Sequence, residues 1–121
     1  MLYLLLLVLS ACAPSSPADF RQAGDAWAKG FAADLRDIES RDDLERAIPR
    51  IKRHYNRLAE LVGEVAEWER AHPGVKVPFE PTQGGDALFI ELARVRELPG
   101  GKEILEDCEG ESIRAILRFK G

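Results

Sequence analysis

Apolar residues recur at helical spacing along most of this chain, beginning with the stretch from Asp19 to Glu39. At about 3.6 residues per turn they fall within roughly a third of the helical circumference, and charged residues occupy the other side. This pattern predicts an amphipathic helix whose apolar side carries Phe20, Gly24, Trp27, Ala28, Phe31, Leu35 and Ile38. Glycine inside a helix costs about 1 kcal/mol relative to alanine, so Gly24 indicates a close contact with a neighbouring helix.

A longer helix is predicted from Ser40 to about His72. Ser40 followed by Asp43 approximates a capping box, and His72-Pro73-Gly74 forms a typical helix end. Between them, apolar residues alternate at spacings of four and three, which is the heptad pattern of a helix packed along a partner: Leu44, Ile48, Ile51, Tyr55, Leu58, Val62 and Val65. Pro49 interrupts the pattern, so either the helix kinks there or a short turn precedes a main helix that has Pro49 in its first turn.

Residues 73–85, PGVKVPFEPTQGG, contain three prolines and three glycines and are expected to leave the helical conformation. Two interpretations are open for so long a connection. It is either a binding loop with Phe79 at its tip, or a strap that lays Val75, Val77 and Phe79 over the core.

Two further helices complete the pattern. The first begins at Asp86, has Leu88, Phe89, Leu92 and Val95 on one side, and ends at Pro99-Gly100-Gly101. The second runs from about Lys102 to Phe119, with one face formed by Ile104, Leu105, Cys108, Ala115, Ile116 and Phe119. Alternation typical of a strand is confined to Val75-Lys76-Val77. The fold class is therefore all-α, and we expect residues 19–121 to form one irregular, mainly antiparallel bundle of about four helices.

Composition fits one globular domain. The chain has 121 residues, 45% of them hydrophobic and 31% charged, and its 17 Lys and Arg against 21 Asp and Glu give a formal net charge of −4. A nucleic-acid partner is not expected, because nucleic-acid-binding domains are usually strongly basic. Two cysteines cannot make a disulfide scaffold.

The first twelve residues form a separate feature. Met1 to Ser10 is an apolar run of the length of a signal-peptide core and shorter than the ~20 residues that span a bilayer. The run ends in Leu9-Ser10-Ala11-Cys12, which resembles the lipobox of bacterial lipoprotein precursors. The basic residues that usually open such a signal are absent here. The alternative is a buried N-terminal helix in which Cys12 is an ordinary cysteine.

The resemblance implies that residues 1–11 are a signal peptide and that Cys12 becomes the lipidated N-terminus. Residues 12–18 would then be the acylated cysteine and a small, polar, proline-bearing tether, which reaches at most about 20 Å. Ala13 stands where an Asp would favour retention at the inner membrane. The resemblance thus implies an extracytoplasmic protein anchored by lipid to the cell membrane or, where the cell has one, to the outer membrane.

Residues that could carry catalysis are sparse. The chain lacks HExxH, CxxCH, GxSxG, Walker and dinucleotide-binding motifs, so no metal, cofactor or catalytic residue is assigned. His54 lies on the flank of the apolar seam, where a structural imidazole is more common than a ligand. Cys108 is expected to be a buried, inert thiol, with an intermolecular disulfide as the alternative.

The most informative polar feature is a stripe of four arginines in the long helix, which we call the arginine stripe: Arg46, Arg50, Arg53 and Arg57. Spacings of four, three and four place them on one face, opposite the apolar seam. Guanidinium groups suit phosphate or carboxylate, so the stripe is a candidate binding surface for an anionic envelope component or an acidic protein. Alternatively, it is a solvated face paired with the acids Asp34, Asp37, Glu39, Asp42 and Asp43.

These observations favour a lipid-anchored, non-enzymatic helical module of the bacterial envelope that acts as a binding or structural protein. The helical domain resembles small helical bacterial lipoproteins in general, a class that implies no particular activity. One alternative is a carrier or sensor that holds a small apolar ligand within the bundle, which requires a closed apolar cavity. Another is a small hydrolase, which requires two carboxylates that converge in a cleft.

Overall fold

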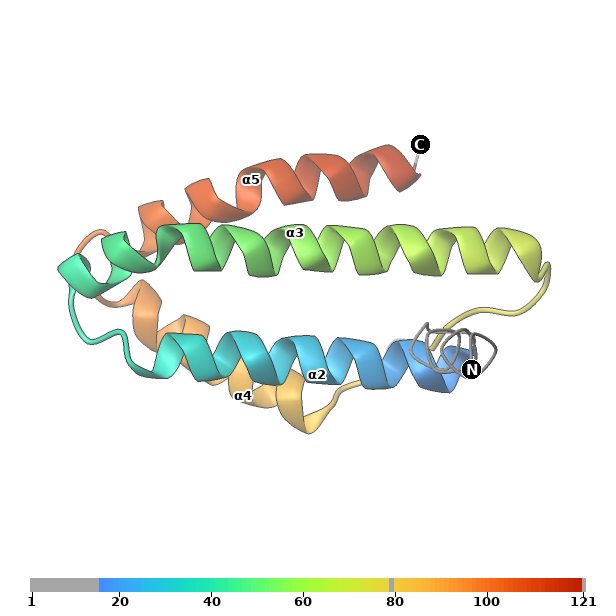
Figure 1. Cartoon of the computed structure of the whole chain (residues 1–121), viewed down its shortest axis with the longest axis horizontal. Coiled ribbons are helices and arrows are strands. Elements are labelled where there is room, and N and C mark those ends of the chain that lie inside the picture. The colour runs from blue at the N-terminus through green and yellow to red at the C-terminus, as the bar shows by residue number, and fades with distance from the viewer. Residues whose placement is uncertain (1–15, 79, 121) are drawn as a thin grey trace, which may run out of the picture.

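The computed structural model describes residues 16–78 and 80–120, without the side chains of Glu111 and of 115–120. This part of the chain holds four helices, labelled as in Figure 1: α2 (Pro17–Arg36), α3 (Arg41–Ala71), α4 (Gln83–Arg96) and α5 (Gly101–Lys120). The described residues contain no strand. The all-α prediction is confirmed. Cys12, residues 1–11, where a signal peptide is expected, and Phe79 lie outside the described residues.

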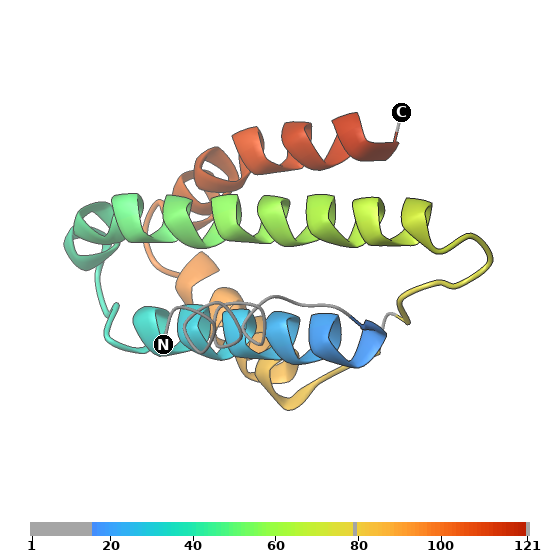
Figure 2. The same cartoon turned by 45° about the vertical axis from the view of Figure 1, so that its right-hand side comes forward.

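Consecutive helices run antiparallel; the α2–α3 and α4–α5 turns lie at one end of the molecule, and the α3–α4 loop leaves α3 at the other end (Figure 1). Helices two apart in the chain pack side by side in the same direction, α4 on α2 and α5 on α3 (Figure 2). Gly84 in the first turn of α4 contacts Asp25, whereas Arg94 in its last turn reaches Ile38, just beyond α2. The bundle is therefore irregular, as expected, and its packed antiparallel pairs are α2–α3 and α4–α5.

Helix α2 begins earlier than expected, at Pro17. The Ser16 Oγ accepts the N–H of Asp19 at 3.2 Å, and proline fits the first helical position because it lacks an N–H to satisfy. Residues 16–18, which were expected in the tether, therefore form the cap and first turn of α2.

Helix α3 begins as the capping box predicts and continues through Pro49. The Ser40 Oγ accepts the N–H of Asp43 at 3.1 Å, and the Asp43 carboxylate accepts the N–H of Glu39 at 3.0 Å. Pro49 is exposed, while Ala47 and Ile51 on either side of it are buried. Packing of both flanks against the core holds the helix together, so the interpretation in which a separate turn precedes the main helix is wrong.

Helix α4 begins at Gln83 rather than Asp86, because the Thr82 side chain caps it by accepting the N–H of Gly85 at 3.0 Å. The first turn therefore includes Gly84, which is buried against α2: a Cβ built there would lie 2.5 Å from the carbonyl oxygen of Asp25. Gly24, by contrast, has open space around the position of a Cβ. The close helix contact exists, but the expectation that it lies at Gly24 was wrong.

The core lies between the helices, toward the end of the molecule that holds the α2–α3 and α4–α5 turns (Figure 1). Its largest fully buried side chains come from α2, the α2–α3 turn, α3 and α4: Phe31, Leu35, Ile38, Leu44, Ile51 and Val95. Leu88 and Val95 face this core as predicted, but Phe89 is 75% exposed. The prediction for Phe89 was wrong because α4 packs chiefly on α2, and the described helices leave its outer side uncovered.

Candidate functional site

The arginine stripe lies on the solvent-facing side of α3. Arg46, Arg50, Arg53 and Arg57 are all exposed, while residues on the opposite side of the helix, such as Ile51 and Tyr55, are buried. The helix between them is continuous, so the four guanidinium groups project from one rigid element over about 16 Å of its length.

The two outer arginines of the stripe are paired within α3 itself. Arg46 donates to Asp43 at 2.8 Å, and Arg57 donates to Glu60 at 3.0 Å and to Glu64 at 3.3 Å. The N–H of Glu39 and then the Arg46 guanidinium hold the pKa of Asp43 below its ordinary value. Asp43 therefore stays ionised at neutral pH and offsets the charge of Arg46.

The two inner arginines are different. Among the described residues, neither Arg50 nor Arg53 has an ion pair or a side-chain hydrogen bond. Of the five acids expected to neutralise the stripe, only Asp43 pairs with one of its arginines; Asp34 binds His54 instead, because His54 lies directly across the α2–α3 contact. The stripe thus presents two uncompensated guanidinium groups at its centre.

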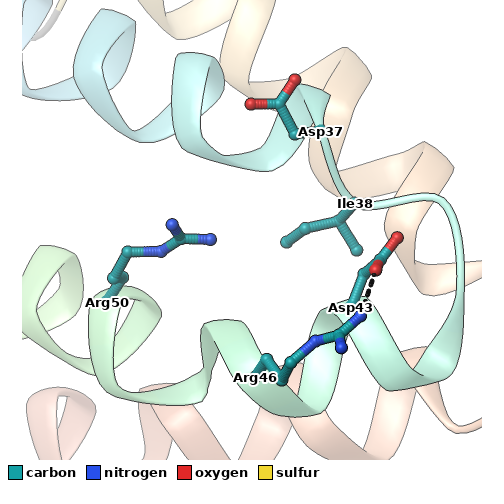
Figure 3. Close-up of a pocket in the computed structure, with 5 residues that line it drawn as sticks. All are labelled: Asp37, Ile38, Asp43, Arg46 and Arg50. Carbon is teal, nitrogen blue, oxygen red and sulfur yellow. Dashed lines mark hydrogen bonds and ion pairs between the residues drawn. The ribbon is translucent and has the colours of Figure 1, made fainter.

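A shallow hollow of about 390 Å³ adjoins the stripe where α2 turns into α3 (Figure 3). It is lined by Asp37, Ile38, Asp43, Arg46 and Arg50. In Figure 3 the Arg50 guanidinium points into the space between the two helices, whereas Arg46 is turned toward Asp43. The position of Arg50 allows it to bind an anionic group that enters from solvent.

The two carboxylates of the hollow do not form a converging acid–base pair (Figure 3). Asp37 and Asp43 project in different directions in Figure 3, and Asp43 is committed to Glu39 and Arg46. A general acid at neutral pH needs a raised carboxyl pKa, and that of Asp43 is lowered. The geometry fits binding of an anion better than hydrolysis.

Beside the stripe lies an aromatic cluster that sequence reasoning did not find. His54 Nε2 donates to Asp34 Oδ2 at 2.6 Å, and its ring stacks on Phe31 with centroids 4.7 Å apart. The Trp27 indole N–H donates to the His54 carbonyl oxygen at 2.6 Å. His54 is thus the satisfied interfacial imidazole that its position predicted. The sequence could not identify Asp34 as the partner of His54, because that pairing depends on the register between α2 and α3.

The remaining histidine, Cys108 and Tyr55 are titratable side chains that lie outside the arginine stripe. His72 caps the end of α3 and stacks on Trp68. Cys108 is buried, and burial raises the pKa of its thiol. Burial and the neighbouring Glu109 carboxylate likewise raise the pKa of Tyr55. Within the part of the chain that the structure describes, no group of three or more potential metal ligands converges.

The loop between α3 and α4, residues 72–82, is tied at two points. The N–H of Val77 donates to Glu69 at 3.2 Å, and Glu80 pairs with Arg21 at 3.5 Å. Val75 is 45% exposed and does not cover the core, whereas Val77 is half-buried.

Comparisons with protein-family models, with curated proteins and with solved structures find no match to this chain, as expected for the helical domain. None of the helices in the described residues has the length and apolarity needed to cross a bilayer.

Proposed function

We propose that this chain is a lipid-anchored, extracytoplasmic helical module of the bacterial envelope, not an enzyme, and that it docks on an anionic partner through the arginine stripe. The observation that carries the docking role is the contrast within the stripe. Arg46 and Arg57 are neutralised inside α3, but Arg50 and Arg53 are exposed without a described partner.

The lipobox Leu9-Ser10-Ala11-Cys12 supports the anchored location. Because α2 begins at Pro17, four residues lie between Cys12 and the first residue of the helix, and the five residue steps from Cys12 to Pro17 reach about 17 Å at full extension. Anionic head groups near a bilayer attract each basic side chain with about 1 kcal/mol, so a stripe held this close to the membrane is well placed to bind them.

The anchor is tested by intact-mass analysis of the protein extracted from membranes. We expect an acylated Cys12 as the first residue. Recovery of the chain from the soluble fraction with Met1 intact would show that the lipobox is not used.

The docking role is tested on the acylated protein in nonionic micelles. Short-chain phosphatidylglycerol is titrated in one arm, phosphatidylcholine in a second, and proteins captured from solubilised envelopes are compared in a third. The R50E/R53E variant should lose at least about tenfold in affinity for the anionic ligand, and the loss should shrink at high salt.

The matched control is K52E/K102E, which changes the net charge equally at exposed lysines outside the stripe. Binding to phosphatidylglycerol alone would identify head groups as the partner, and stripe-dependent capture of an acidic protein would identify a protein instead. Equal binding by both double variants in every arm would refute the role of the stripe.

The carrier of a small apolar ligand is less well supported. The hollow beside Arg50 and a second one of about 340 Å³ lined by Asp42, Glu45 and Arg46 are open and lined mostly by charged side chains. Neither is the closed apolar cavity that such a carrier needs.

A further inference from the structure

The outer side of α4 carries an apolar patch that the described helices leave open to solvent. Phe89 is 75% exposed and Ile90 is 65% exposed, and Ala93 beside them is exposed as well. The opposite side of α4 packs inward through Gly84, Leu88 and Val95. Single exposed apolar residues are ordinary, but two large adjacent ones on one helix are typical of a contact surface.

The residues that cross this patch have a spacing that reads the same in both directions. Asp86, Phe89, Ala93 and Arg96 follow one another at intervals of three, four and three, so they share one side of the helix. If two copies of α4 pack antiparallel about a twofold axis, Asp86 of each lies opposite Arg96 of the other, and Phe89 lies opposite Ala93. In such a contact every acid faces a base, and every large side chain faces a small one.

The charged residues at the two ends of the patch are available for this pairing. Asp86 has no ion pair among the described residues, and Arg96 has one, with Glu106, at the long distance of 3.8 Å. Arg94, in contrast, is held by Glu91 and by two carbonyl oxygens at the end of α2.

We propose that the outer side of α4 is a self-association surface on which two copies of this chain pack antiparallel. A contact between two 14-residue helices is smaller than the roughly 1,600 Å² of a standard interface, so we expect a weak, reversible dimer with a dissociation constant on the order of micromolar. This inference is independent of the arginine stripe, which lies on α3.

The test is sedimentation velocity of the full chain in density-matched nonionic detergent, over a range of protein concentrations. Wild type is expected to shift from monomer to dimer in the micromolar range. F89A should remain monomeric throughout, with an unchanged circular dichroism spectrum because Phe89 is largely exposed.

Charge exchange tests the antiparallel register. D86R places two basic residues at each end of a homodimer and R96D places two acidic ones, so each variant alone should be monomeric. An equimolar mixture of the two should dimerise, since every end then pairs an acid with a base, and the double variant D86R/R96D should dimerise by itself. K52E, which alters an exposed charge on α3, serves as the control and should dimerise as wild type does.

A wild type that stays monomeric to high micromolar concentration would overturn the proposal. So would dimers that survive F89A, or a mixture of the two charge variants that fails to associate. If F89A lowers affinity for neutral vesicles while wild type sediments as a monomer, the patch contacts lipid and the proposal is equally wrong.

Discussion

The carboxylate of Asp25 in α2 caps the N-terminus of α4 by accepting the N–H of Gly84 at 2.8 Å, from a residue 59 positions further along the chain. The same carboxylate pairs with Lys29 at 2.8 Å. This one side chain therefore fixes where α4 begins along α2. The hydrogen bond from Lys29 and, to a smaller extent, that from Gly84 lower the pKa of Asp25 to about 2.

Asp25 should make stability depend on pH in the acid range. The unfolded chain binds a proton at Asp25 near the ordinary value of 3.8, whereas the folded chain binds one only near 2. The stabilisation is therefore complete above about pH 4 and disappears as the pH falls through about 2. Urea unfolding of wild type and D25N between pH 2 and 7 should give a stability difference that is largest at neutral pH. A difference that is constant with pH would contradict the capping role.

Gly84 should tolerate no side chain. In G84A the new Cβ meets the Asp25 backbone, so α4 must shift away from α2, at a cost of about 1–3 kcal/mol in the free energy of unfolding. G30A is the matched control: Gly30 is exposed on α2 with open space around it, and alanine there should stabilise by about 0.5–1 kcal/mol. Equal effects of the two substitutions on chemical denaturation would show that the α2–α4 contact is not tight.

The two glycines show what the sequence could and could not predict. Helical periodicity identified all four helices, because each buries one apolar face and periodicity depends only on that. It placed the close contact at Gly24 instead of Gly84, because which glycine meets a neighbour depends on how far one helix is shifted along another. Phe89 was misplaced for a related reason: its spacing from Leu88 and Leu92 fits an inward face, but the described structure places no helix against that side of α4.

Arg94 should hold the end of α2 through its guanidinium geometry. Its two terminal nitrogens donate to the carbonyl oxygens of Leu35 and Ile38, each at 2.7 Å, at the helix end where free carbonyls favour a cation. We expect R94A to lower the free energy of unfolding by about 1–3 kcal/mol. R94K should recover only part of this loss, since an ammonium group cannot reproduce the planar fork.

R36A is the control for Arg94. Arg36 lies in the last turn of α2, the helix whose end Arg94 contacts, and is exposed without a described partner, so its loss should change the free energy of unfolding by less than about 0.5 kcal/mol. If thermal unfolding places R94K level with wild type, charge at the helix end is sufficient and the paired hydrogen bonds are not required.

For the candidate site, the sequence predicted which residues share a face but not which of them are paired. The arginine stripe follows from spacing alone, and all four side chains are exposed as that spacing requires. Which of them keep a free charge could not be predicted, because Asp34 was a possible partner for the stripe until the α2–α3 register placed it beside His54.

Thiol labelling can test both the burial of Cys108 and the proposed acylation of Cys12. Its thiol is buried and burial raises its pKa, so a maleimide should label it at least about a hundredfold more slowly in the native protein than in denaturant. In denaturant, the membrane-extracted chain should take up one label, located at Cys108 by peptide mass, because the proposed acylation would block Cys12. The C108A variant is the control, and it should take up no label. Two labels per wild-type chain would show that Cys12 carries a free thiol, and rapid labelling of the native protein would show that the α3–α5 contact opens more readily than its packing implies.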